Sequence, residues 1–270
     1  AAASPPPPPL WPAPQLASFF DGTEHSNVLR TVNLAGGFDF DFIVKQNNPH
    51  VMNILEQAKS RLLTSLIRSI PRDAPSRPNN PTNKTLRYVQ GIRIFITSSE
   101  HYGLRHNVTE SYRLRVRASM NDDDDDDYIL LEAPTVYGAL HGLQTLRQLL
   151  PFAWNGDGGA PIFEVAGAPF RIQDFPAFAY RGLLIDTSRH YLPLDLILHN
   201  LDALAMNKMN VLHWHMVDSQ SWPYQSEVFP ELSAKGAYCA ECIYTPDQVR
   251  LVISEAELRG IRVIPEFDLP

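Results

Sequence analysis

The sequence predicts an α/β chain in which an α+β domain precedes a parallel sheet. Residues 38–42 alternate phenylalanine with aspartate, which is the two-residue period of a strand with one buried face. Residues 51–70 and 135–150 instead repeat apolar side chains every three to four positions, the period of a helix packed on a core. From residue 180 onward, apolar strands alternate with amphipathic helices, and this alternation is typical of a parallel sheet.

The first region, residues 21–175, predicts one sheet covered by two helices. Its expected elements are a strand at 38–42, a helix at 51–70, strands at 92–96, 112–116 and 128–131, and a helix at 135–150. This order favours an antiparallel sheet with both helices on one face. Residues 1–20 are rich in proline and are expected to be extended, with Leu10 and Trp11 as the docking side chains. Glycines, prolines and a short hairpin in residues 151–176 indicate a domain boundary.

The second region, residues 176–270, predicts three strands with helices between them. Strands are expected at 182–185, 211–217 and 261–267, and helices at 194–206 and from 245 to about 258. The second helix has clear end signals: Thr245 suits the N-cap, Pro246 suits the first helical position and Gly260 suits the stop. Ligands bind at the carboxyl ends of parallel strands, so the residues that follow each strand are the functional candidates.

Composition narrows the class of protein. The chain has 270 residues and a net charge of −7, which argues against a nucleic-acid binder with a basic face. No apolar run approaches the roughly 18 residues that span a membrane. The first residues show neither a basic nor an apolar leader segment, so no signal peptide is visible. Asn83 and Asn107 each begin an N-x-T sequon, and the two sequons favour a protein of the secretory pathway.

Two further features have plain structural interpretations. Cys239 and Cys242 are the only cysteines, and no second pair for zinc or thioredoxin-like pattern accompanies them. They therefore predict either two loop thiols or one short disulfide. Asp122 to Asp127 is a run of six aspartates without the spacing and glycine of a calcium loop, and it predicts a solvated hairpin tip.

Polar side chains at the ends of the predicted strands are suited to a polar ligand. Arg189 follows the first strand, and its planar fork of donors suits a carboxylate, a phosphate or adjacent sugar hydroxyls. A salt bridge to Asp186 or to another carboxylate is the structural alternative. Asp218 follows the second strand and can accept from a hydroxyl or orient a histidine, with a loop cap as its alternative.

His213 and His215 raise a second interpretation of the same strand end. They share a strand face with Asp218 nearby, as in some metal-dependent barrel hydrolases. No third nitrogen ligand follows, so buried or supporting histidines are the favoured interpretation and no metal is assigned. Trp222, in the loop after the strand, is a candidate for stacking on a sugar, whereas Trp214 is expected in the core.

The longest motifs resemble those of β-N-acetylhexosaminidases, glycoside hydrolase family 20. The matching stretches are RGLLIDTSRHYLPL, NKMNVLHWHMVDSQSWPY, FPELSAKGAY, IYTPDQV and RGIRVIPEFDLP. LWPAP and TVYGALHGLQTLRQLL resemble the small α+β domain that precedes the barrel in this family. The resemblance covers nearly the whole chain. It implies a (β/α)8 TIM barrel, of which residues 176–270 would form the first three β/α units, truncated after the third strand.

The resemblance also implies an activity. It implies hydrolysis of terminal β-linked N-acetylglucosamine or N-acetylgalactosamine with retention, assisted by the acetamido group of the substrate and without a cofactor. Arg189 would hold hydroxyls of the terminal sugar, and Asp218 would tune the acid network. Asp268 would pair with the histidine of a following P-G-H motif, while Asp186 and His215 would support the site.

The Asp-Glu pair that supplies the acid/base in this family is expected after residue 270, so no catalytic residue is assigned within the chain. We therefore expect the 270-residue chain alone to be inactive and prone to aggregate, because three parallel strands leave an open edge. The alternatives are a non-catalytic hexosaminidase-like carbohydrate-binding protein and a metal-dependent barrel hydrolase.

The resemblance implies partners and a compartment as well. The expected partners are glycans, glycolipids or chitin oligomers that end in N-acetylhexosamine. The expected location is lysosomal, vacuolar or extracellular. For a full-length protein, the resemblance leaves a homodimer open.

Overall fold

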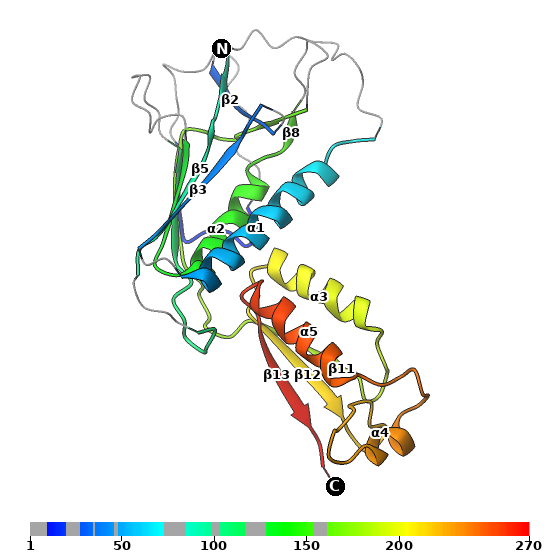
Figure 1. The fold of residues 1–270 in the computed structure, drawn as a ribbon. Coiled ribbons are helices and arrows are strands. Elements are labelled where there is room, and N and C mark those ends of the chain that lie inside the picture. The colour runs from blue at the N-terminus through cyan, green and yellow to red at the C-terminus, as the bar shows by residue number, and fades with distance from the viewer. Residues whose placement is uncertain are drawn as a thin grey trace. The chain divides into compact units, whose positions relative to one another are not determined.

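A computed structural model describes residues 10–19, 28–34, 36–45, 48–72, 85–98, 103–116, 128–153 and 161–269. Asn83 and the aspartate run at 122–127 lie outside these residues. Contacts within the chain divide it into two compact units. Unit 1 comprises residues 1–101 and 109–176, and unit 2 comprises residues 102–108 and 177–270. Each unit contains its own sheet and helices (Figure 1).

Unit 1 is built on a six-stranded sheet with the order β1-β10-β6-β7-β5-β3. The strands predicted from the sequence are confirmed at four of these positions, whereas the edge strand β1 and its neighbour β10 were not predicted. The bounds are Leu16–Phe19 for β1, Asp39–Val44 for β3, Gly91–Ile96 for β5, Tyr112–Val116 for β6, Tyr128–Ala133 for β7 and Phe170–Asp174 for β10.

The sheet is mixed, so the prediction of an antiparallel sheet is wrong. Strands β3, β5 and β7 run parallel to one another, and β6, β10 and β1 continue the sheet from β7 in antiparallel pairs. The connection from β3 to β5 contains a long helix and the strand β4, and a crossover with a helix returns the chain in the same direction. The strand β7 then lies between β5 and β6, an arrangement that the order of elements along the chain does not reveal.

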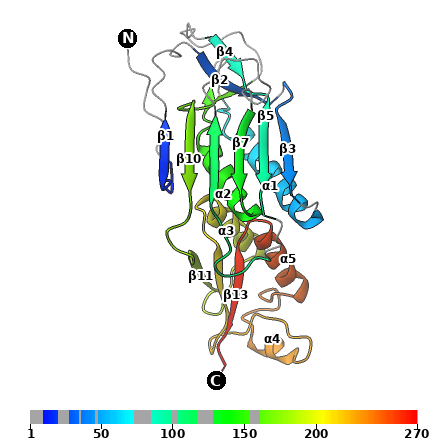
Figure 2. The ribbon, with the colours of Figure 1, turned by 90° about the vertical axis from the view of Figure 1, so that its left-hand side faces the viewer.

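Two helices, α1 (Pro49–Arg68) and α2 (Val136–Gln148), lie on one face of this sheet, as predicted (Figure 2). The side chain of Asn48 caps α1, and the hydroxyl of Thr135 caps α2 by accepting from the backbone of Gly138. The predicted apolar stripe of α1 is confirmed, since its buried residues are Ile54, Leu55, Ala58, Leu62 and Leu66.

A second sheet of four strands, β4-β2-β9-β8, was not predicted apart from its hairpin β8–β9. The bounds are Val28–Asn33 for β2, Thr85–Tyr88 for β4, Phe152–Ala153 for β8 and Ile162–Glu164 for β9. The proline-rich segment is attached through the backbone of Trp11, which exchanges two hydrogen bonds with the side chain of Gln148. The indole of Trp11 stays 70% exposed, so the expected docking through this side chain is wrong.

Unit 2 contains a three-stranded parallel sheet in the order β11-β12-β13, as predicted. Its core includes Trp214 on β12, which meets the ring of Tyr244 edge-on at 5.1 Å between centroids. Helices α3 and α5 pack against each other, and the short helix α4 was not predicted. The bounds are Gly182–Asp186 for β11, Leu194–Met206 for α3, Val211–Val217 for β12, Glu231–Gly236 for α4, Pro246–Glu257 for α5 and Arg262–Phe267 for β13.

Within the part of the chain that the structure describes, no helix is both long and apolar enough to cross a membrane.

A glycine on α2 gives a test of the close packing in unit 1. A Cβ atom at Gly138 would overlap the carbonyl oxygen of Ser111, which belongs to the backbone before β6. Alanine favours a helix over glycine by about 1 kcal/mol, yet overpacking costs roughly 1–3 kcal/mol. We expect Gly138→Ala to lower the free energy of unfolding in urea denaturation. Gly103→Ala, where a Cβ meets nothing within 4 Å, is the control. A stabilised Gly138→Ala variant would contradict the packing.

Candidate functional site

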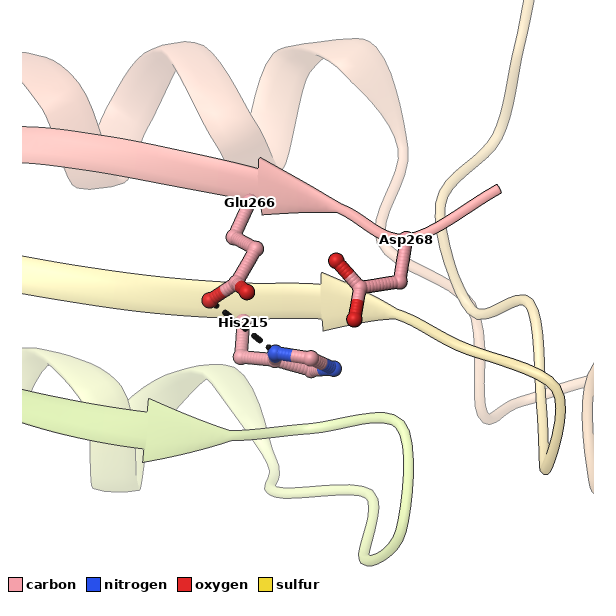
Figure 3. Close-up of side chains that lie close together, drawn as sticks. All are labelled: His215, Glu266 and Asp268. Carbon is pink, nitrogen blue, oxygen red and sulfur yellow. Dashed lines mark ion pairs between the residues drawn. The ribbon is translucent and has the colours of Figure 1, made fainter. Parts of the chain in front are cut away.

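The carboxyl ends of the three strands of unit 2 bring polar side chains into one row. Asp186 on β11 is the register partner of His215 on β12, and His215 is the partner of Glu266 on β13. Side chains of register partners stand on the same face of a parallel sheet, about 5 Å apart. Figure 3 shows Glu266 directed toward His215, with Asp268 just past the end of β13. The row therefore places two carboxylates on either side of one imidazole.

Asp186 shapes the loop that follows β11. Its Oδ1 accepts hydrogen bonds from the backbone nitrogens of Ser188 at 3.1 Å and Arg189 at 3.0 Å. Its Oδ2 accepts from Nη1 of Arg189 at 2.7 Å. Partial burial raises the pKa of Asp186, but the hydrogen bonds from Arg189 outweigh it and hold this pKa below its ordinary value. One carboxylate therefore both folds the loop and holds the guanidinium.

The guanidinium of Arg189 joins three side chains. Besides its bond to Asp186, Nη1 lies 3.1 Å from Nε2 of His215. Nη2 forms an ion pair with Oδ2 of Asp218 at 2.6 Å. The side chain remains 49% exposed, so it is held in place and still open to solvent. The salt bridge to Asp186 that the sequence offered as an alternative is thus present, and it leaves the guanidinium available to a ligand.

Asp218 reaches the same face as His215 because β12 is bulged. Two residues three positions apart on a regular strand point to opposite faces, but the register shifts between His215 and Val217. As a result Oδ2 of Asp218 lies 3.3 Å from Nε2 of His215. The backbone N–H of Ser219, which donates to Asp218 at 2.6 Å, is the main cause that lowers the pKa of Asp218, and Arg189 adds to it. Asp218 is therefore both the predicted loop cap and a partner of Arg189.

Glu266 holds both histidines of the strand and was not predicted as a site residue. Its Oε2 lies 2.6 Å from Nε2 of His213 and 3.0 Å from Nδ1 of His215. The hydrogen bond from His215 is the main cause that lowers the pKa of Glu266, opposed by partial burial and assisted by His213. The available signal was a carboxylate at the end of the apolar run of residues 263–265, two positions before Asp268.

The two loops at the strand ends are fastened to each other. The hydroxyl of Ser188 donates to the carbonyl of Ser221 at 2.9 Å, and the hydroxyl of Ser221 donates to the carbonyl of Ser188 at 2.6 Å. Both serines are buried. Behind them, Nε1 of Trp214 donates to the hydroxyl of Thr187 at 2.9 Å. These bonds fix the positions of the loops that carry Arg189 and Asp218 before any ligand arrives.

Three aromatic residues lie near these loops. Trp214 is 1% exposed, as predicted for a core residue. Trp222 also packs against the core of unit 2, and its Nε1 is buried without a partner among the described residues. Its stacking role stays a prediction. Tyr238, which the sequence did not single out, is 57% exposed, and its hydroxyl lies 3.4 Å from the carbonyl oxygen of Arg189.

The electrostatics of the site favour a neutral ligand rich in hydroxyls. Carboxylates outnumber cations here, because Asp186, Asp218 and Asp268 all act on the single guanidinium of Arg189. An anionic ligand would meet this excess of negative charge, whereas hydroxyl groups can donate to carboxylates and accept from the guanidinium.

His215, Glu266 and Asp268 also offer ligand atoms within 4.8 Å of one another, a donor set that a divalent cation can accept. Nδ1 of His215, however, is already engaged with Glu266.

Two family models match separate parts of this chain. Residues 178–270 match the family model described as the catalytic domain of glycosyl hydrolase family 20, and residues 10–149 match the model described as beta-acetyl hexosaminidase like. The chain belongs to the hexosaminidase family, glycosyl hydrolase family 20. The resemblance read from the sequence motifs is thereby confirmed.

Individual proteins of this family are also similar to the chain in sequence and in structure. The chain is 48% identical to the beta-hexosaminidase subunit beta of Homo sapiens over 184 residues, which cover 67% of this chain and 30% of the relative. It is 38% identical to beta-hexosaminidase 1 of Arabidopsis thaliana over 269 residues, covering 98% and 46%. The chitobiase structure from Flavobacterium johnsoniae matches with a TM-score of 0.68 at 32% identity, covering 97% and 34%. The chain thus spans less than half the length of these relatives.

The lowered pKa values predict sensitivity to acid. A carboxyl whose pKa is lower in the folded chain stabilises it fully above the unfolded pKa, and this stability is lost as the pH falls through the folded pKa. The pKa values of three carboxyls, Asp186, Asp218 and Glu266, are lowered in this way, whereas carboxyls in an unfolded chain titrate at about pH 4. We expect the melting temperature to fall progressively below about pH 4. Calorimetry should show a shallower fall for Asp186→Asn, and an equally steep fall would contradict this prediction.

Proposed function

We propose that the full-length protein is a β-N-acetylhexosaminidase that removes terminal β-linked N-acetylglucosamine or N-acetylgalactosamine with retention. The proposed reaction is assisted by the substrate, because the acetamido oxygen of the sugar attacks the anomeric carbon and a carboxylic acid protonates the leaving oxygen. Membership of glycosyl hydrolase family 20 supports this activity, and so do relatives named hexosaminidase and chitobiase. No metal enters this chemistry, since the nucleophile belongs to the substrate.

The observation that carries the proposal is the fixed and half-exposed guanidinium of Arg189. Its Nη1 and Nη2 are held by Asp186, His215 and Asp218, whereas the described residues offer no acceptor to Nε. A planar fork of donors suits adjacent hydroxyls of a pyranose. We propose that Arg189 and Asp218 bind hydroxyls of the terminal sugar, with Asp186 and His215 supporting them.

We propose that the remaining residues of the site follow residue 270 in the full-length protein. We propose that the three strands of unit 2 are the start of a (β/α)8 barrel formed by residues 176 onward, preceded by the α+β domain of residues 21–175. The Asp-Glu pair that serves as acid/base would follow the fourth strand of this barrel. Asp268 would orient a histidine that follows it.

We propose a compartment and substrates of the same kind. Asn107 is exposed in a turn, where a glycan has room, and Cys239 and Cys242 form a disulfide. A disulfide persists in oxidising compartments, so it supports a protein of the secretory pathway, lysosomal, vacuolar or extracellular. The proposed substrates are glycans, glycolipids or chitin oligomers with a terminal N-acetylhexosamine.

Turnover decides between this function and its alternatives. The full-length protein should hydrolyse 4-nitrophenyl N-acetyl-β-glucosaminide, release the β-anomer first and keep its rate after dialysis against EDTA. Binding of the sugar without hydrolysis would favour the non-catalytic carbohydrate-binding protein instead. Loss of activity with EDTA and its return with zinc would favour a metal-dependent hydrolase.

Replacing the guanidinium tests the role of Arg189. Arg189→Lys keeps the charge but removes the planar fork, so we expect kcat/KM for the same substrate to fall roughly 10- to 100-fold. Arg250→Lys is a matched control, because Arg250 also pairs with an aspartate three positions earlier, Asp247, at 2.6 Å. This control should leave kcat/KM unchanged. Equal effects of the two substitutions would refute the binding role.

A further inference from the structure

We propose that Glu266 is a positioning residue for the sugar-binding arginine, and that it acts by fixing the tautomer of His215. This inference rests on the proposed function and extends it to a side chain on β13 that does not itself contact Arg189 in the structure. Glu266 contacts His215 (Figure 3), and His215 in turn contacts Arg189.

Glu266 determines which ring nitrogen of His215 carries the proton. An ionised carboxylate only accepts hydrogen bonds, so Nδ1 of His215, 3.0 Å from Oε2 of Glu266, must carry a proton to bond there. His213 donates to the same oxygen through Nε2 at 2.6 Å. Glu266 stays ionised because these hydrogen bonds lower its pKa. Two donors thus converge on one oxygen of a carboxylate that remains charged at neutral pH.

Nε2, on the opposite side of the His215 ring, faces Arg189. A neutral imidazole with its proton on Nδ1 presents a lone pair at Nε2. That atom lies 3.1 Å from Nη1 of Arg189, which can donate to it. The side chain of His215 is 6% exposed, so water gives this nitrogen little alternative. Arg189 is therefore held by an acceptor that exists only while Glu266 keeps the proton on the far side of the ring.

Loss of the Glu266 carboxylate would move the proton of His215 to its other ring nitrogen. Without an acceptor at position 266, Nδ1 of His215 loses the carboxylate oxygen 3.0 Å away, while Oδ2 of Asp218 remains 3.3 Å from Nε2. The proton then favours Nε2, where it bonds to Asp218 and faces an N–H of Arg189. An N–H of His215 would then face an N–H of Arg189, and Asp218 would have to accept from both side chains. The guanidinium would move from the position in which its remaining N–H groups meet the sugar.

The test compares Glu266→Gln with Glu266→Leu in the full-length protein. Glutamine keeps an oxygen acceptor at this position, and leucine keeps bulk but removes the acceptor. We expect Glu266→Leu to raise KM for 4-nitrophenyl N-acetyl-β-glucosaminide roughly 10-fold or more, with a smaller fall in kcat. Glu266→Gln should stay within about threefold of wild type. Glu266→Ala serves as the second variant if Glu266→Leu does not fold.

Glu255→Ala is the matched control for a structural effect. Glu255 lies on α5, is 33% exposed and pairs with Arg259, whereas Glu266 is 34% exposed. The control should lower the melting temperature without changing KM. A comparable rise in KM for Glu255→Ala and Glu266→Leu would overturn the positioning role, and so would an unchanged KM in Glu266→Leu.

A spectroscopic readout separates this inference from the proposed function. In protein labelled with nitrogen-15 at histidine, the shifts of His215 should show the proton on Nδ1 in wild type and Glu266→Gln. They should show it on Nε2 in Glu266→Leu. Retention of the Nδ1 proton in Glu266→Leu would overturn the inference even with normal turnover. Absence of turnover in wild type, with the tautomer changing as expected, would instead refute only the proposed enzyme activity.

Discussion

The guanidinium of Arg189 is the cation that the strand ends of unit 2 share. Asp186, Asp218 and Asp268 all act on it, and Asp186 and Asp218 contact it directly at 2.7 and 2.6 Å. Carboxylates this close together would repel one another and resist ionisation without a positive charge between them. The loop after β11, the bulge of β12 and the row of register partners all serve to place this one side chain. A half-exposed guanidinium surrounded by acceptors is also the feature on which the proposed recognition of a sugar rests.

The parallel sheet and its core make this arrangement rigid before a ligand binds. Register partners align Asp186 with His215 and His215 with Glu266, so the network spans all three strands. The reciprocal bonds of Ser188 and Ser221 fasten the loops, and the hydroxyl of Tyr244 donates to the carbonyl of Leu192 beyond Arg189. Side chains held in this way lose little further freedom on binding, which is the advantage of a preorganised site.

Periodicity and end signals predicted the elements well where local chemistry decides. The capping box of α5 follows from Thr245, and the span of β12 follows from a largely apolar run interrupted only by two histidines. Long-range pairing was beyond such signals, so the mixed sheet of unit 1 and its second sheet were missed. The site shows the same limit. Arg189, Asp218 and His215 stood out as polar residues near strand ends, but Glu266 acquires its partners only through the register of β12 and β13. The bulge that turns Asp218 toward His215 likewise has no signature in the sequence.

We propose that the terminal sugar binds at the guanidinium of Arg189, and a crystal structure of the full-length protein soaked in N-acetylglucosamine would test this binding mode. We expect hydroxyl oxygens of the sugar within hydrogen-bonding distance, about 3 Å, of both Arg189 and Asp218, with the ion pair between Arg189 and Asp186 intact. A sugar bound elsewhere, with Arg189 contacting only its protein partners, would contradict it.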